Sequence, residues 1–203
     1  MTILSKNDQK GRSMVEMLGV LAIIGVLSVG GISGYSKAMA KFKLTKAQDQ
    51  ISMLLMNIRT AFATSPSYDG LNNGNAVAFA IAPGDMYGGV VNQSTDISQL
   101  NNAFGGGAHV FACNETTHIG GFACTAENSA ALSSSQFFAI ALSKLGREAC
   151  VSLASSDWGT DGLVSIKVNN EIYTASELPI NMIQAGKSCG KYGTTSSIVW
   201  TYY

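Results

Sequence analysis

The sequence predicts an α+β protein in which a long N-terminal α-helix, half of it transmembrane, packs on a globular head with an antiparallel β-sheet. Three observations support this prediction. No side chain is charged from Met17 to Tyr35, a run of 19 residues. An amphipathic stretch follows that run, and no proline occurs before Pro66. Beyond Pro66, short β-branched and aromatic segments alternate with turn residues and short helical patterns, which is typical of α+β domains.

The composition is that of a helix and one globular domain. The chain has 203 residues, of which 46% are hydrophobic and 13% charged, and its formal net charge is zero. Roughly 140 residues follow Pro66, which suffices for one domain with its own core. The neutral balance argues against nucleic acid as a main partner, because proteins that bind nucleic acid usually carry a basic face.

The first eleven residues are interpreted as a leader that the mature protein lacks, because they are polar and show no periodicity. Gly11 lies five residues before Glu16, and the apolar run begins directly after this carboxylate. The basic residues that precede the run are Lys6, Lys10 and Arg12.

The apolar run is long enough for a membrane helix. Its 19 residues correspond to roughly 28 Å at about 1.5 Å per residue, close to the thickness of a bilayer's hydrocarbon core. The span and its flank contain five glycines, which would either permit close packing of membrane helices or let the helix unwind locally during assembly. These are Gly19, Gly25, Gly30, Gly31 and Gly34.

The pattern Gly-x-x-x-x-Glu, followed at once by an apolar run, resembles the processing site of type IV prepilins and pseudopilins. The resemblance extends from Lys10 to about Phe62. It implies that a membrane peptidase cuts between Gly11 and Arg12, that the new N-terminus at Arg12 is methylated, and that Glu16 directs assembly. The family often has Phe or Met at the first mature position, and this residue varies more in its type IVb branch.

The resemblance implies a structural subunit of a type IVb-like pilus, assembled by helix–helix packing into an extracellular filament. Its partners would be other copies of itself, a prepilin peptidase, an inner-membrane platform protein and an assembly ATPase. Before assembly the subunit would reside in the bacterial inner membrane with its head in the periplasm. We expect no enzymatic activity, cofactor or metal. The alternatives are a pseudopilin of a type II secretion system and a secreted binding or enzymatic domain, released by signal peptidase after Ala40.

Residues 36–64 continue the helix with an apolar stripe at steps of three and four. The stripe comprises Ala47, Ile51, Leu54, Leu55, Ile58 and Phe62. The other side is polar, with Lys43, Lys46, Asp49, Gln50, Asn57 and Arg59. We therefore expect one helix over residues 12–65, about 50 residues or roughly 75 Å long, with a transmembrane half at 14–35 and a head at 66–203.

Within the head, turn residues predict a loop over 64–75 and a turn at Gly105-Gly106-Gly107. Candidate strands lie at 76–82, 108–113 and 198–203, and the Asn169-Asn170 pair predicts a β-hairpin of residues 163–168 and 171–175. Short helices are predicted over 133–146, from a serine cap and a terminal glycine, and over 179–186, from Pro179 near the first turn.

Four cysteines, Cys113, Cys124, Cys150 and Cys189, predict two disulfides in an exported head, with three possible connectivities. We favour the pairs Cys150–Cys189 and Cys113–Cys124, and the first resembles the C-terminal disulfide loop of type IV pilins. A zinc site formed by Cys113 and Cys124 with His109 and His118 is the minor alternative, since its spacing matches no compact zinc pattern. An oxidising compartment also favours disulfides over zinc.

Overall fold

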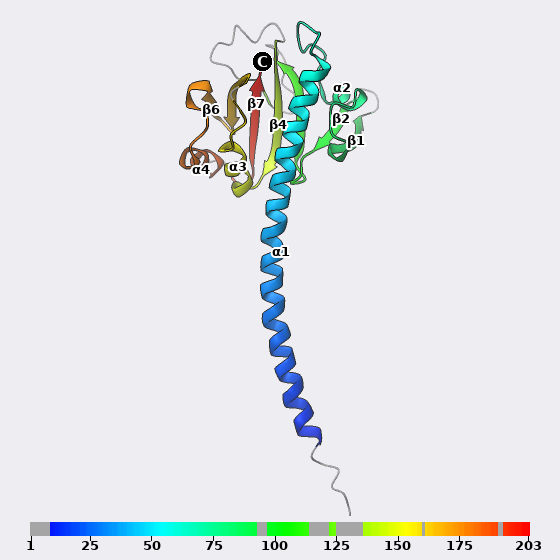
Figure 1. The fold of residues 1–203 in the computed structure, drawn as a ribbon, viewed down its shortest axis with the longest axis vertical. Coiled ribbons are helices and arrows are strands. Elements are labelled where there is room, and N and C mark those ends of the chain that lie inside the picture. The colour runs from blue at the N-terminus through cyan, green and yellow to red at the C-terminus, as the bar shows by residue number, and fades with distance from the viewer. Residues whose placement is uncertain (1–8, 93–96, 114–121, 125–135, 160, 191–192) are drawn as a thin grey trace, which may run out of the picture. The chain divides into compact units, whose positions relative to one another are not determined.

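The structure is a computed structural model that describes residues 9–92, 97–113, 122–124, 136–159, 161–190 and 193–203 (Figure 1). The chain divides into two compact units, Met1–Phe42 and Lys43–Tyr203. Helix α1 (Gln9–Ala61) supplies the described part of the first unit and enters the second.

In the first unit, α1 presents an apolar surface that no other described part of the chain covers. Every described side chain from Met14 to Lys37 is exposed, including Leu18, Ile24 and Val29. By length and composition this helix is able to cross a membrane. A Cβ added at any of the five glycines of the span would meet no atom within 4 Å. Any close packing through these glycines must therefore involve another molecule.

In the second unit, the C-terminal part of α1 packs on the sheet along the predicted stripe. Ala47, Ile51, Leu54 and Ile58 have no exposed surface, so the helical period predicted from the sequence is confirmed. Leu55 and Phe62 pack partly buried against the same core. Burial of one stripe, as here, is what holds an amphipathic helix on a sheet.

The head contains an antiparallel sheet, which confirms the predicted fold class. Its described strands are β1 (Tyr87–Asn92), β2 (Ile97–Asn101), β3 (Gly107–Cys113), β4 (Phe137–Leu145), β5 (Leu163–Val168), β6 (Glu171–Thr174) and β7 (Ser196–Tyr202). They are ordered β1-β2-β3-β4-β7-β5-β6, and every paired strand is antiparallel to its neighbour. The last strand, β7, therefore lies between β4 and β5, as Figure 1 shows.

The two faces of the sheet bury separate clusters. Phe138, Trp200 and Tyr202 lie with α1 in the larger one. Phe111, Ala139, Ala141 and Val199 form a smaller cluster, because successive side chains of a strand point to opposite faces. The central strands are thus apolar on both sides.

The described helices of the head besides α1 are short. They are α2 (Asn73–Ala78), α3 (Arg147–Ala154), α4 (Met182–Gly190) and the 3₁₀ turns η1 (Gly84–Met86) and η3 (Ala175–Glu177). Helix α4 begins at Met182, three residues after the predicted start at Pro179, and continues to Gly190.

Two predicted elements of the head are wrong. The helix expected over 133–146 is strand β4 in its described part, residues 136–146. Five consecutive residues, from Phe138 to Leu142, are buried on both faces, and an unbroken apolar run does not distinguish a strand from a helix. The strand expected over 76–82 is instead the end of helix α2, up to Ala78, followed by a turn at residues 79–80. The start of α2 is capped by the Asn72 side chain, which accepts from the Asn75 N–H.

The remaining strand predictions are confirmed. Strand β3 covers the candidate at 108–113, and β5 and β6 form the predicted hairpin. The final strand begins two residues earlier than predicted, at Ser196, and ends at Tyr202.

Candidate functional site

Three predicted site residues lie in the first turns of α1. Gly11, Arg12 and Glu16 are all within the helix that begins at Gln9. Arg12 and Glu16 are four residues apart, which places their backbone positions on one face at successive turns. Glu16 itself is exposed and is followed by the uncharged surface that starts at Met17.

A carboxylate at this position requires a partner once the helix leaves water. An isolated ion in an apolar environment is strongly unfavourable unless it is paired or neutralised. Among the side chains that the structure describes, none makes an ion pair with Glu16. A cation that neutralises Glu16 in an apolar setting would thus come from the undescribed side chains before Met14 or from another molecule.

The head is cross-linked twice. Cys150 on α3 joins Cys189 on α4, with their Cα atoms 5.8 Å apart and both side chains buried. Cys113, the last residue of β3, joins Cys124 with a Cα separation of 5.7 Å. These are the two pairs favoured from the sequence.

The Cys113–Cys124 disulfide leaves neither of these cysteines as a thiolate that could bind zinc. Both cysteines of the alternative zinc set are bonded to each other, and His118 lies outside the described residues. His109 is half-buried on β3, and its ring lies 5.4 Å from that of Phe122. Burial there lowers the pKa of His109 below its ordinary value, so the ring favours its neutral form.

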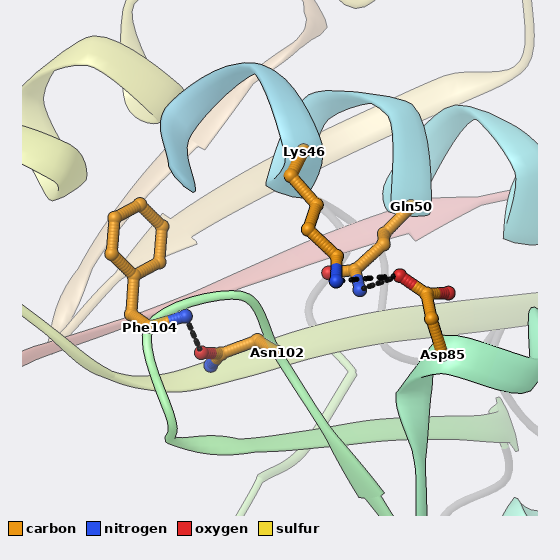
Figure 2. Close-up of polar contacts among 5 residues, drawn as sticks. All are labelled: Lys46, Gln50, Asp85, Asn102 and Phe104. Carbon is orange, nitrogen blue, oxygen red and sulfur yellow. Dashed lines mark hydrogen bonds and ion pairs between the residues drawn. The ribbon is translucent and has the colours of Figure 1, made fainter. Parts of the chain in front are cut away.

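Part of the polar side of α1 contacts other segments of the head, although Lys43 and Asp49 on that side are exposed. The Lys46 ammonium lies 3.0 Å from the Asp85 carboxylate, and the Gln50 amide donates to the same oxygen at 3.0 Å (Figure 2). Further along the helix, Asn57 donates to the Ile81 carbonyl at 2.8 Å. Three polar side chains of α1 thus hold the segment that ends in η1.

These contacts fix the charge state of Asp85. Partial burial raises its pKa, but hydrogen bonds from Lys46 and Gln50 and the charge of Lys46 lower it, and the net pKa is below the ordinary value. Gln50 is only 4% exposed, so its amide is available to few partners besides this carboxylate. No sequence pattern predicts this contact, because it joins residues 35 positions apart.

Arg59 makes a second connection from α1. Its guanidinium donates to the Asp161 carbonyl and lies 5.8 Å from the centre of the Tyr202 ring. Gly162 has a positive φ of +81°, and a Cβ there would lie 2.5 Å from Arg59 Nη2. This close approach is why glycine follows Asp161.

The predicted glycine turn before β3 is organised by Asn102. Its carboxamide oxygen accepts from the Phe104 N–H at 2.9 Å, as Figure 2 shows. The same oxygen accepts from the Gly106 N–H at 3.1 Å. Its amide group donates to the Ser143 carbonyl at 2.8 Å, which connects the turn to β4. A Cβ on Gly106 would lie 2.0 Å from that carbonyl oxygen, so only glycine fits.

Known proteins resemble this chain over nearly its whole length. No family profile matches it. The major structural subunit of the bundle-forming pilus of Escherichia coli O111:H- is 24% identical over 209 aligned residues, covering 98% of this chain and 96% of the relative. The subunit of the same name from E. coli O127:H6 is equally similar, at 24% identity.

A solved structure shares the fold. The type IVb pilin of Salmonella typhi superposes with a TM-score of 0.52 and 22% identity, covering 80% of this chain and 98% of that one. The long helix and the antiparallel sheet therefore make a known architecture.

Proposed function

We propose that this chain is a structural subunit of a type IVb-like pilus, because it is similar to pilus subunits in sequence and to a type IVb pilin in fold. The observation that carries this proposal is an exposed apolar helix with one carboxylate at its start, on the same chain as a pilin-like head. Both curated relatives are named as pilus subunits, which favours a pilus over the pseudopilin and secreted-domain alternatives.

The subunit matures by cleavage between Gly11 and Arg12 and by methylation of the new N-terminus. Support comes from the spacing of Gly11 and Glu16 and from the basic leader before them. A prepilin peptidase of the inner membrane performs the cut. The mature chain keeps its apolar segment, in contrast to a chain cut by signal peptidase after Ala40.

Glu16 selects the stagger between neighbouring subunits. Cleavage creates a charged amine at Arg12, and the matching amine of an adjacent copy, displaced along the filament axis, neutralises the Glu16 carboxylate. The apolar helix surface supports this role, because an unpaired charge among packed helices is costly. The Arg12 side chain supplies a second cation near the same position.

Assembly places the subunit in two locations. Before assembly, α1 spans the inner membrane and the head lies in the periplasm, and afterwards the helices pack together in an extracellular filament. An inner-membrane platform protein and an assembly ATPase drive this transfer. The role is structural, and it needs neither catalysis nor a cofactor.

The test of this function is the substitution Glu16→Ala. The variant is produced in cells that contain the assembly machinery, and filaments are sheared from those cells. We expect membrane insertion and cleavage after Gly11 to continue, with little or no sheared filament. The neighbouring substitution Met17→Ala is the matched control and should leave the filament yield near that of the wild type. Normal yields of correctly processed Glu16→Ala filament would contradict the proposed role of the carboxylate.

A further inference from the structure

Two exposed lysines, Lys37 and Lys41, follow the uncharged span of α1 within two turns of the helix. The span ends at Tyr35, shortly before the first of them. Residues four positions apart lie on the same face of a helix at successive turns. Both lysines belong to the first compact unit, Met1–Phe42, so helix α1 alone sets their relative position.

No described residue neutralises these two ammonium groups. Neither of them makes an ion pair with a residue that the structure describes. No Asp or Glu occurs between Glu16 and Asp49, so no acidic residue lies three or four positions from either lysine. Like charges four residues apart disfavour a helix, and an anion that contacts both would relieve this repulsion. The surface formed by Lys37 and Lys41 therefore carries a charge that another molecule is able to pair.

The two lysines lie on the side of the span where membrane insertion does not require them. Positive residues collect on the cytoplasmic side of membrane helices and set their orientation. The chain before the span already supplies Lys6, Lys10 and Arg12 on the side that the proposed function places in the cytoplasm. Lysines after the span weaken this bias, so their presence there points to a partner on the side of the head.

Their distance from the span fits the headgroup level of a bilayer. Tyr35 is 67% exposed, and tyrosines of membrane helices are enriched where the hydrocarbon core meets the headgroups. At about 1.5 Å per residue, Lys37 and Lys41 follow Tyr35 by roughly 3 and 9 Å along the helix axis. The headgroup region is about 5–8 Å deep on each side of a bilayer. Because a lysine stem is flexible, both ammonium groups are able to reach the lipid phosphates.

We propose that Lys37 and Lys41 form a binding surface for the headgroup of an anionic phospholipid in the leaflet nearest the head. The ammonium groups supply positive charge and hydrogen-bond donors, and the lipid supplies a phosphate whose charge no group of its own headgroup cancels. This surface depends on the proposed membrane location of α1. It goes beyond the filament role, because it gives the unassembled subunit a preference among lipids.

The experiment reconstitutes the full, unassembled chain in phosphatidylcholine vesicles that contain a trace of spin-labelled lipid. Electron paramagnetic resonance measures the fraction of the label that the protein immobilises, separately for phosphatidylglycerol and phosphatidylcholine labels. We expect the wild type to prefer phosphatidylglycerol. Replacing Lys37→Gln and Lys41→Gln together should lower this preference by about twofold or more, since each lysine near a membrane surface attracts anionic lipid. The basic residues before the span add a background that all variants share.

Further variants separate charge from other properties of the side chains. The double change Lys37→Arg and Lys41→Arg keeps both charges and should keep the wild-type preference. Either glutamine change alone should give an intermediate preference. Lys167→Gln is the matched control, because it removes one lysine from strand β5 of the head, and it should behave as the wild type does. In about 1 M sodium chloride, where the Debye length is about 3 Å, the preference should largely disappear.

The proposal is overturned if the wild type immobilises both labelled lipids equally, or if the double glutamine variant keeps the wild-type preference. It is also overturned if sodium phosphate abolishes the preference at an ionic strength at which sodium chloride does not, because the lysines would then bind the free anion.

Extraction of the reconstituted chain at alkaline pH separates failure of this proposal from failure of the proposed function. A chain that alkali extracts from the vesicles refutes the membrane location of α1, and the lipid surface with it. A chain that stays inserted but shows no preference for phosphatidylglycerol refutes the lipid surface alone.

Discussion

At the residue scale, three polar side chains of α1 contact the segment of the head that ends in η1. Lys46 and Gln50 both contact the Asp85 carboxylate, and Asn57 contacts the Ile81 carbonyl. Asp85 has 44% of its side-chain surface exposed, so its ion pair is worth little, on the order of 0.2–1 kcal/mol. The contact is nevertheless useful as a probe, because it is the one ion pair among the described residues.

We predict that acid weakens this contact. The pKa of Asp85 is lowered in the folded protein, so its contribution to stability is full above the unfolded pKa of about 3.9 and is lost as the pH falls through the folded pKa. Urea unfolding of the wild type and of Asp85→Asn, measured between about pH 6 and pH 2, should give a stability difference of up to about 1 kcal/mol that disappears in acid. A difference that does not change with pH would contradict this assignment.

The candidate site residues of α1 stay a prediction from sequence spacing, whereas the contacts of the head could not be predicted from the sequence. Gly11, Arg12 and Glu16 are recognised by their spacing within one short segment, so no tertiary information is needed. The contact between Gln50 and Asp85 joins distant parts of the chain. Helical periodicity assigns Gln50 to the polar side of the helix. It does not predict that another segment of the head covers part of that side.

At the element scale, local signals predicted some elements well and failed for others. Helix α1 has a clear apolar stripe, and the β5–β6 hairpin has an asparagine turn between two β-branched segments. Strand β4 was mistaken for a helix because it lies at the centre of the sheet, where neither face is polar and no alternation remains. Helix α2 was mistaken for a strand because its six residues are too few to show a helical period.

The Cys150–Cys189 disulfide should be the more important of the two for stability. It closes 39 residues and connects α3 to α4, whereas Cys113–Cys124 closes only 11. In the chain-entropy account these loops correspond to about 4 and about 3 kcal/mol. We predict that the double substitution Cys150→Ala and Cys189→Ala lowers the unfolding free energy by several kcal/mol and the abundance of the subunit.

The matched comparison is the double substitution Cys113→Ala and Cys124→Ala, which should have the smaller effect on the urea midpoint. Non-reducing peptide mapping of the wild type tests the premise of both experiments. Free thiols at Cys150 and Cys189 in protein recovered from the periplasm would refute the pairing, and equal midpoints for the three proteins would refute its role in stability.

At the scale of the whole molecule, the two compact units differ in where their apolar side chains lie. The first exposes an apolar helix that is unstable in water unless lipid or other helices cover it. The second is a head with its own core and two disulfides, which suits an oxidising environment outside the cytoplasm. A subunit that moves from membrane to filament needs both, since the helix is covered in each location while the head remains folded.

The central claim is that this chain, cut after Gly11, forms filaments. Its most direct test combines electron microscopy of cells that produce the chain and of a matched deletion strain with intact-mass measurement of the sheared material. We predict surface filaments on the producing cells alone, built from a subunit that begins at a methylated Arg12 and retains its apolar helix. A processed chain that begins at Lys41, or identical cell surfaces with and without the gene, would contradict the account.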